Sequence, residues 1–153
     1  MERAVARIDL DAVRANCARL AEELGEAELC AVVKADGYGH GAVECARAAL
    51  AGGATRLAVA TATEAEQLAA ALPGTPLLTL GALTAAEVDV ALGAGSDLTV
   101  WREGFRRLVA ERAGALGRPA RVHVKHDSGM GRLGNPDAEE VLALARACAA
   151  DPD

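Results

Sequence analysis

The sequence predicts an α/β fold in which helices pack on a parallel sheet. Five short apolar runs alternate with amphipathic segments, and the connections between them are short, a pattern typical of βαβ units. Alanine makes up roughly a quarter of the 153 residues, several times its usual share, and aromatic residues only 2%. Small side chains of this kind suit helices that lie close to a sheet of valine and leucine, and they disfavour a β-sandwich.

The apolar spacing places the elements along the chain. The run at 29–35 is apolar except for Lys34, so we expect a strand buried on both faces. Glycines follow the first two helices, as expected at helix ends. The predicted helices lie at 11–24, 41–51, 63–72, from 84 onward, 103–116 and 136–150, and the predicted strands at 29–35, 57–62, 77–80, 98–101 and 122–125.

Capping residues predict where three of these helices begin. Thr63 with Glu66, and Thr84 with Glu87, match the capping-box pattern, in which each side chain bonds the other residue's backbone N–H. Asn135 is the predicted N-cap of the last helix, because a proline follows it in the first turn.

Composition and charge exclude several classes of function. The 16 basic and 22 acidic residues give a net charge of −6, which disfavours binding to nucleic acid or to an anionic membrane. No segment is long and apolar enough to span a membrane, and residues 1–10 lack the apolar core of a signal peptide. The three histidines are too scattered to predict a metal site. Four cysteines without C-x-x-C spacing predict reduced packing residues in a cytoplasmic protein: Cys17, Cys30, Cys45 and Cys148.

The end of the first predicted strand carries a candidate reactive lysine. Strand alternation puts Lys34 on a buried face, where an ammonium needs either a salt-bridge partner or a role as a Schiff-base amine. Glycines at 37, 39 and 41 let the backbone approach a ligand closely, and the helix that follows offers N–H groups to an anion. Together with Tyr38, these features suggest an aldehyde cofactor that carries a phosphate.

A rival interpretation of the same segment is dinucleotide binding. Gly37, Gly39 and Ala42 satisfy the fingerprint G-x-G-x-x-[GA], and Glu64 lies at a tolerable distance downstream for a ribose contact. The fingerprint alone is weak. A cation and an anion also precede the first glycine here, where a pyrophosphate would have to come close.

The end of the fifth predicted strand carries a second polar group. Val122 and Val124 face one way, and His123, Lys125 and Asp127 face the other. In a (β/α)₈ barrel the valines would pack on helices, and the polar set would point into the mouth where such barrels keep their chemistry. Two lysines in one mouth repel unless one is neutralised as an imine or by a modification. The alternative is an edge strand with a solvated charged face.

Three segments together resemble a known family. Residues 31–41 resemble the pyridoxal-phosphate attachment motif of alanine racemases, 125–134 that family's second motif, and 8–11 the stretch that opens these enzymes. The resemblance implies a pyridoxal-phosphate-binding (β/α)₈ TIM barrel followed by a β-rich C-terminal domain, working as a homodimer. Residues 1–153 would be the N-terminal portion of that barrel, with about five of its eight strand–helix units.

The resemblance also implies roles for individual residues. Lys34 would carry the pyridoxal 5'-phosphate and act as the base on the D-alanine side, and Tyr38 would bind the cofactor phosphate. Arg132 would contact the cofactor's phenolic oxygen and help to position the substrate. Lys125 matches a lysine that is carbamylated in many members. The implied activity interconverts L-alanine and D-alanine through an aldimine and supplies D-alanine for peptidoglycan in the cell wall.

One departure from the family bears on activity. The family's second catalytic base is a tyrosine of the partner subunit's C-terminal domain, and Tyr38 is the only tyrosine in this sequence. We therefore expect this chain alone to be inactive or nearly so. The alternative function is a pyridoxal-phosphate carrier or homeostasis protein of related barrel fold. The pair of Lys125 and Arg132 argues against it, because a carrier needs no residues that position a substrate.

Overall fold

Five parallel strands in chain order form the sheet. The computed structural model describes residues 4–151. Its strands are β1 (Cys30–Val32), β2 (Arg56–Val59), β3 (Leu77–Thr79), β4 (Asp97–Val100) and β5 (Val122–Val124), and its helices are α1 (Leu10–Leu24), α2 (Lys34–Gly39), α3 (Ala42–Ala51), α4 (Ala62–Ala71), α5 (Ala85–Gly93), α6 (Glu103–Leu116) and α7 (Ala138–Ala150). The strand order in space is β1-β2-β3-β4-β5, with every neighbouring pair parallel.

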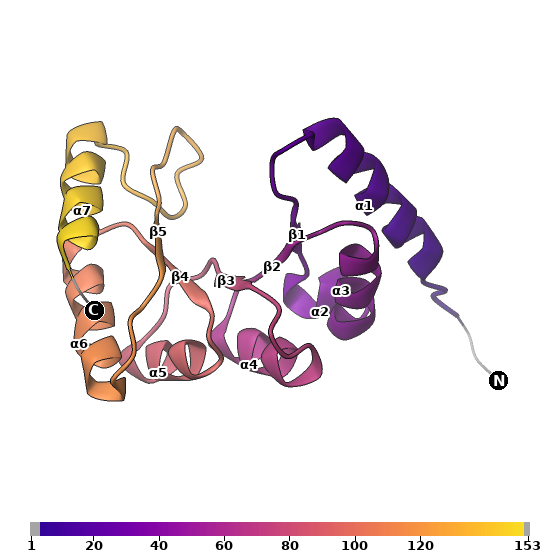
Figure 1. Ribbon diagram of the computed structural model, residues 1–153, viewed down its shortest axis with the longest axis horizontal. Helices are drawn as coiled ribbons and strands as arrows, with labels where there is room; N and C mark the ends of the chain where they lie inside the picture. The colour runs from indigo at the N-terminus through magenta and orange to yellow at the C-terminus, as the bar shows by residue number, and fades with distance from the viewer. Residues whose placement is uncertain (1–3, 152–153) are drawn as a thin grey trace.

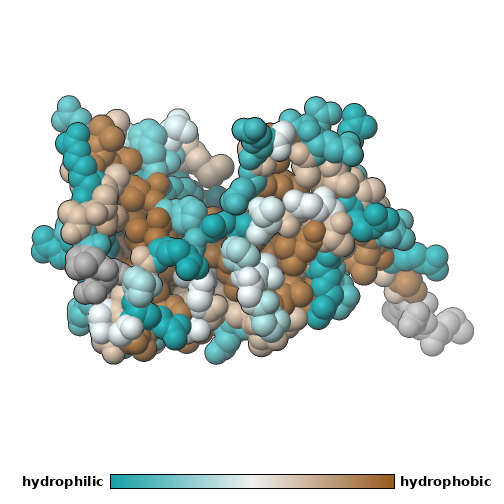
Figure 2. Space-filling model, in the orientation of Figure 1, coloured by the Kyte–Doolittle hydropathy of each residue, from teal (hydrophilic) through white to brown (hydrophobic). Residues whose placement is uncertain are grey.

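This order is that of a barrel wall. A doubly wound dinucleotide-binding sheet reverses its strand order at a switch point, whereas here each strand simply adds to the last one. The helices lie around the outside of the arc that the strands form, and the other side of the arc is open (Figure 1). Figure 2 shows this open side as a notch between the part that holds α1 and the part that holds α7. The predicted partial barrel of five parallel strands is therefore confirmed.

The apolar core lies between the sheet and the helices outside it. The register sets Leu57 beside Ala31 and Leu77, and Leu98 beside Val122, so apolar side chains form rows on one face. Small residues let the helices approach this face, and five helix alanines are at most 1% exposed: Ala46, Ala62, Ala65, Ala91 and Ala113. Val122 and Val124 also pack against this core, as their alternation predicts.

The opposite, inner face of the sheet carries charge. The Asp97 side chain is 4% exposed and forms ion pairs with Arg56, Arg121 and His123. Burial raises the pKa of Asp97, but hydrogen bonds from Arg56, His123 and Arg121 outweigh this effect and hold its pKa below the usual value. These residues lie at or near the beginnings of their strands, at the end of the sheet opposite Lys34 and Lys125.

The first strand differs from its prediction. The run at 29–35 forms a strand only over Cys30–Val32, and Val32 is 40% exposed. The expected burial on both faces is wrong, because the register places Val32 on the same face as Arg56, which is the open inner face of the sheet. β1 is also an edge strand that pairs only with β2 in the described chain. The backbone leaves the strand before Lys34, which begins α2 instead.

The beginning of α4 also differs. The prediction that Thr63 and Glu66 form its capping box is wrong. Thr61 is the N-cap: its hydroxyl accepts a hydrogen bond from the Glu64 N–H at 3.2 Å, and Oε2 of Glu64 accepts one from the Thr61 N–H at 3.1 Å. The helix therefore begins one residue before the predicted first residue.

The last helix begins two residues later than predicted. Asp137 caps α7 by accepting hydrogen bonds from the N–H groups of Glu139 and Glu140. Asn135 is not the cap, because its backbone bonds back to the chain that follows β5. The capping box of Thr84 with Glu87 is confirmed at the start of α5.

The cysteines are all free thiols, as predicted. Cys45 is buried and the other three are half-buried, and burial raises the pKa of each thiol. Within residues 4–151, no helix is both long enough and apolar enough to cross a membrane.

Candidate active site

The two lysines lie at the same end of the sheet. Lys34 comes two residues after β1 ends, and Lys125 directly follows β5. All five strands are parallel, so the carboxyl ends of the first and the fifth strands share one edge. This is the edge at which barrel enzymes place their chemistry.

Lys34 begins a left-handed turn. Four consecutive residues, from Ala35 to Tyr38, have φ between 51° and 61° and ψ between 37° and 51°. Only Gly37 adopts this conformation without strain, and each of the other three costs roughly 1–2 kcal/mol. Strain of this kind persists only where surrounding contacts impose it, and it clusters at functional sites. The turn brings the Lys34 amine to 5.9 Å from the centre of the Tyr38 ring.

Backbone and side-chain hydrogen bonds hold the turn. The Gly37 N–H donates to the Val33 carbonyl at 2.9 Å, and the Gly41 N–H to the Asp36 carbonyl at 2.8 Å. Oδ1 of Asp36 accepts from the Ala42 N–H at 2.8 Å. The expectation that the start of the following helix offers its N–H groups to an anion is therefore wrong for its first residue, because a carboxylate already occupies that N–H.

Glu64 ties the same turn to the neighbouring strand. Its Oε1 accepts a hydrogen bond from the Ala35 N–H at 2.7 Å, and its Oε2 accepts one from the Ala60 N–H at 2.8 Å and one from the Thr61 N–H. In the dinucleotide interpretation this carboxylate was to bind a ribose. The structure commits both of its oxygens to backbone N–H groups instead.

A second carboxylate organises the loop between β5 and α7, which carries Arg132. Oδ1 of Asp127 accepts from the N–H groups of Gly129 and Met130, and Oδ2 from that of Gly131, at 2.8–3.0 Å. The Gly129 N–H contributes most to holding the pKa of Asp127 below its usual value, and the Lys125 ammonium adds to this effect.

The two ends of this loop are joined by backbone hydrogen bonds. The Asp127 N–H donates to the Asn135 carbonyl at 2.9 Å, and the Asn135 N–H to the Lys125 carbonyl at 3.1 Å. Gly134 has φ +120°, and a Cβ there would lie 2.9 Å from the Asp127 nitrogen, so only glycine fits at this position.

The structure brings some of the predicted site residues together but not others. Lys34 and Tyr38 are in contact range. Among residues 4–151, no carboxylate lies within ion-pair distance of the Lys34 amine, so the salt-bridge interpretation of this lysine finds no partner there. In the same part of the chain, no hydrogen bond or ion pair joins the side chains of Arg132 and Lys125. Arg132 is exposed.

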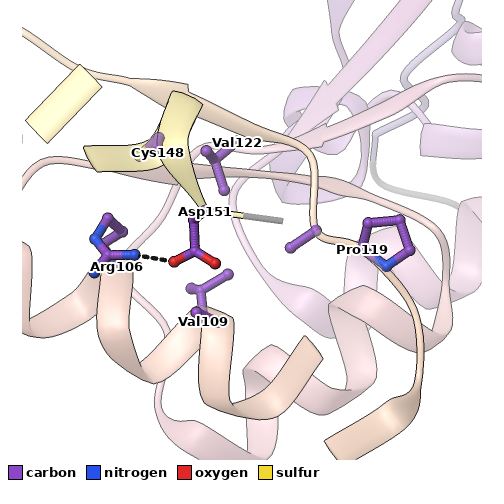
Figure 3. A pocket seen from close by; sticks show the side chains of 8 residues that line it. Arg106, Val109, Pro119, Val122, Cys148 and Asp151 are labelled. Carbon is purple, nitrogen blue, oxygen red and sulfur yellow. Dashed lines mark hydrogen bonds and ion pairs between the residues drawn. The ribbon is translucent and has the colours of Figure 1, made fainter. Parts of the chain in front are cut away.

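A small pocket lies apart from these residues. It has a volume of about 150 Å³ and lies between α6, α7 and the beginning of β5, with the ion pair of Arg106 and Asp151 at its wall (Figure 3). Its thiol, Cys148, has a pKa raised by burial, so it is not an activated nucleophile. The pocket therefore offers no chemistry that competes with that of Lys34.

Comparison with known proteins identifies the family to which the chain belongs. A family model described as alanine racemase, N-terminal domain, matches residues 8–153. The chain belongs to the alanine racemase family. This membership confirms the resemblance seen in residues 8–11, 31–41 and 125–134.

Individual relatives agree over most of the chain. An alanine racemase of Desulforamulus reducens is 44% identical over 146 residues, which cover 94% of this chain and 40% of the relative. That of Thermobifida fusca is 46% identical over 150 residues, covering 96% and 40%. The crystal structure of the alanine racemase from Streptomyces lavendulae superposes with a TM-score of 0.84 at 40% identity, covering 94% of this chain and 38% of that one. The chain thus spans about two-fifths of the length of these relatives.

Sequence reasoning missed the roles of three carboxylates. The sequence predicts a ribose contact for Glu64, a place on the polar face for Asp127, and no role for Asp97. Asp97 had a signal: strand alternation places it on the inner face, where a charged residue needs a partner. The contact of Glu64 with the Thr61 N–H fits a capping pattern, whereas its contact with the Ala35 N–H, 29 positions away, follows no residue pattern.

Proposed function

We propose that this chain forms the cofactor-bearing part of an enzyme that interconverts L-alanine and D-alanine, with residues 1–153 as the N-terminal portion of its barrel domain. One observation carries the proposal. The Lys34 amine lies at the carboxyl edge of a barrel-type sheet beside Tyr38, with no carboxylate partner in the described chain. Family membership supports alanine as the substrate.

The donor set suits pyridoxal 5'-phosphate. Lys34 supplies an amine for its aldehyde, the Tyr38 hydroxyl supplies a donor for its phosphate, and Arg132 supplies a cation for its phenolic oxygen. When bound, this cofactor withdraws electrons from the α-carbon of an amino acid and makes the α-hydrogen acidic. Because the Asp36 carboxylate already accepts from the first N–H group of α3, the phosphate would be held by the Tyr38 hydroxyl and not by that N–H group.

The residues of the chain would then handle protons and position the substrate. Lys34 would remove or return the α-proton on one face of the substrate. Arg132 would hold the substrate in place from a loop that Asp127 keeps ordered. A carbamyl group on Lys125 would change its charge from positive to negative, which removes the repulsion between the two lysines and gives Arg132 an anionic partner.

The reduced state of the four cysteines supports the cytoplasm as the compartment. The family membership supports a homodimeric enzyme that supplies D-alanine for peptidoglycan.

Covalent trapping tests the proposal. Lys34 and Lys125 are the only lysines of the sequence, so a borohydride-reduced pyridoxal phosphate adduct can be assigned by mass spectrometry of two peptides. We expect the adduct on Lys34, its loss in K34A and its retention in K125A. An adduct found mainly on Lys125 or on the N-terminus, and unchanged in K34A, would refute the assignment.

A further inference from the structure

We propose that Glu64 is a positioning residue for Lys34: through the Ala35 N–H it fixes the peptide unit that follows the lysine and so sets the direction of the reactive amine. This inference rests on the proposed function. It assigns to Glu64 a task beyond capping its own helix.

The geometry singles out one peptide unit. The Ala35 N–H belongs to the peptide that joins Lys34 to Ala35, and its hydrogen bond to Oε1 of Glu64 is 2.7 Å long. The orientation of that peptide plane is the ψ angle of Lys34. A carboxylate bound to this N–H therefore controls where the chain turns directly after the lysine, from a residue 29 positions away along the sequence.

The turn needs such a contact because its own residues disfavour it. Ala35 has φ 51° and ψ 51°, a conformation that alanine rarely adopts. In the part of the chain that the structure describes, the Ala35 N–H donates its hydrogen bond to the Glu64 carboxylate. Without it, this N–H would lose its acceptor at the first strained residue of the turn.

Glu64 itself is held firmly in place. Its second oxygen accepts from the Ala60 and Thr61 N–H groups at the end of β2 and the start of α4, so the side chain bridges two adjacent strand ends. Burial raises the pKa of Glu64, and the backbone N–H groups of Ala60, Ala35 and Thr61 more than offset this, so that its pKa lies below the usual value. The group is therefore a carboxylate at neutral pH. Glutamine has only one acceptor oxygen, so it could not accept from the Ala35 N–H with one oxygen and from the Ala60 and Thr61 N–H groups with the other.

The chain contains a matched control for this residue. Glu87 forms the same kind of capping box with Thr84 at the start of α5: its Oε2 accepts from the Thr84 N–H at 2.8 Å and from the Thr84 hydroxyl. Both of these contacts are local, three residues away. Glu87→Gln thus perturbs a capping box without touching the turn at Lys34.

The experiment compares E64Q, E87Q and the unaltered chain by two readouts. Hydrogen exchange reports the protection of the Ala35 amide without any cofactor. Borohydride trapping at a series of times reports the rate at which pyridoxal phosphate modifies Lys34. We expect E64Q to expose the Ala35 amide and to slow the Lys34 adduct, each on the order of tenfold, because a charge-assisted hydrogen bond is lost. E87Q should leave both values unchanged.

The outcomes separate this inference from the proposed function. Failure of the proposed function shows as no Lys34 adduct in the unaltered chain. Failure of the positioning role shows as an E64Q chain that matches the unaltered one in Ala35 exchange, or that loses Ala35 protection yet forms the adduct at the same rate. An equal effect in E87Q would also overturn the inference, because general loosening would then explain both. Should E64Q not fold, E64D supplies the same comparison, since it keeps the charge but shortens the side chain by one methylene group.

Discussion

Replacing Asp97 by asparagine should destabilise the fold by about 3 kcal/mol. The substitution keeps the shape of the side chain but removes a charge that is 4% exposed and paired with Arg56, Arg121 and His123. Breaking a buried ion pair by removing one partner typically costs about 3–5 kcal/mol. We take the lower end because the Arg121 side chain is 70% exposed and can turn to water, which leaves Arg56 as the main uncompensated charge.

Urea unfolding followed by circular dichroism measures this loss. Asp89→Asn is the matched control, because Asp89 also pairs with an arginine, Arg112, but at the surface between α5 and α6, where such pairs contribute little. The folded-state pKa of Asp97 lies below its usual value, so its stabilisation is present above the unfolded pKa of about 3.9 and is lost as pH falls through the folded pKa. The difference between the unaltered chain and D97N should therefore be constant near neutral pH and shrink below about pH 4.

Two results would refute this reasoning. One is a D97N chain no less stable than D89N, which would mean that the inner-face ion pairs contribute nothing. The other is a stability difference that persists undiminished at acid pH, since the loss in D97N would then not come from the charge of this carboxylate.

Three further predictions follow from the two loops and from the single tyrosine. Ala35→Gly should raise the free energy of unfolding by about 0.5–1 kcal/mol, because the left-handed strain that glycine relieves exceeds the entropy it costs. Ala15→Gly, in the exposed middle of α1, is the control and should lower the free energy of unfolding by about 1 kcal/mol. Loss of stability in both variants would show that position 35 is not strained. Asp127→Ala should make trypsin cleave after Arg132 several-fold faster, because the loop loses the acceptor for three backbone N–H groups; an unchanged cleavage rate would show that Asp127 does not order it. With pyridoxal phosphate and L-alanine, the chain should produce no D-alanine above the level given by free cofactor in an oxidase-coupled assay. The reason is that racemisation needs a second base, a tyrosine, and the only tyrosine of the sequence, Tyr38, is already assigned to the phosphate. Turnover that depends on the chain would contradict this.

The sequence predicted the order and type of the main elements because their signals are local. Apolar runs and capping patterns gave five strands and the helices between them, and Val122 and Val124 took the helix-facing side that alternation predicts. The start of α4 was missed for a non-local reason. Thr61 with Glu64 and Thr63 with Glu66 fit the same capping pattern, and the contact of Glu64 with the distant Ala35 N–H accompanies the first pair in the structure.

The left-handed turn was beyond prediction for a similar reason. Alanine and tyrosine disfavour positive φ, so Asp36 and Gly37 are the only local signals for it in residues 35–38, and they do not indicate a left-handed turn of four residues. The conformation is accompanied by hydrogen bonds that the Asp36 and Glu64 carboxylates accept from the Ala42 and Ala35 N–H groups, and the Glu64 contact depends on how the chain folds around β1 and β2. The reactive residue could thus be named from sequence, but not the way in which it is held.

Exchange of the α-hydrogen of D-alanine for solvent deuterium, followed by NMR, tests the central claim that Lys34 moves this proton, because Lys34 is the proposed base on the D-alanine side. The chain with pyridoxal phosphate should exchange the hydrogen faster than free cofactor does, and K34A should fall to the level of free cofactor. Exchange that is equally fast in K34A, or a chain that forms the Lys34 adduct and yet gives no exchange above free cofactor, would contradict the account.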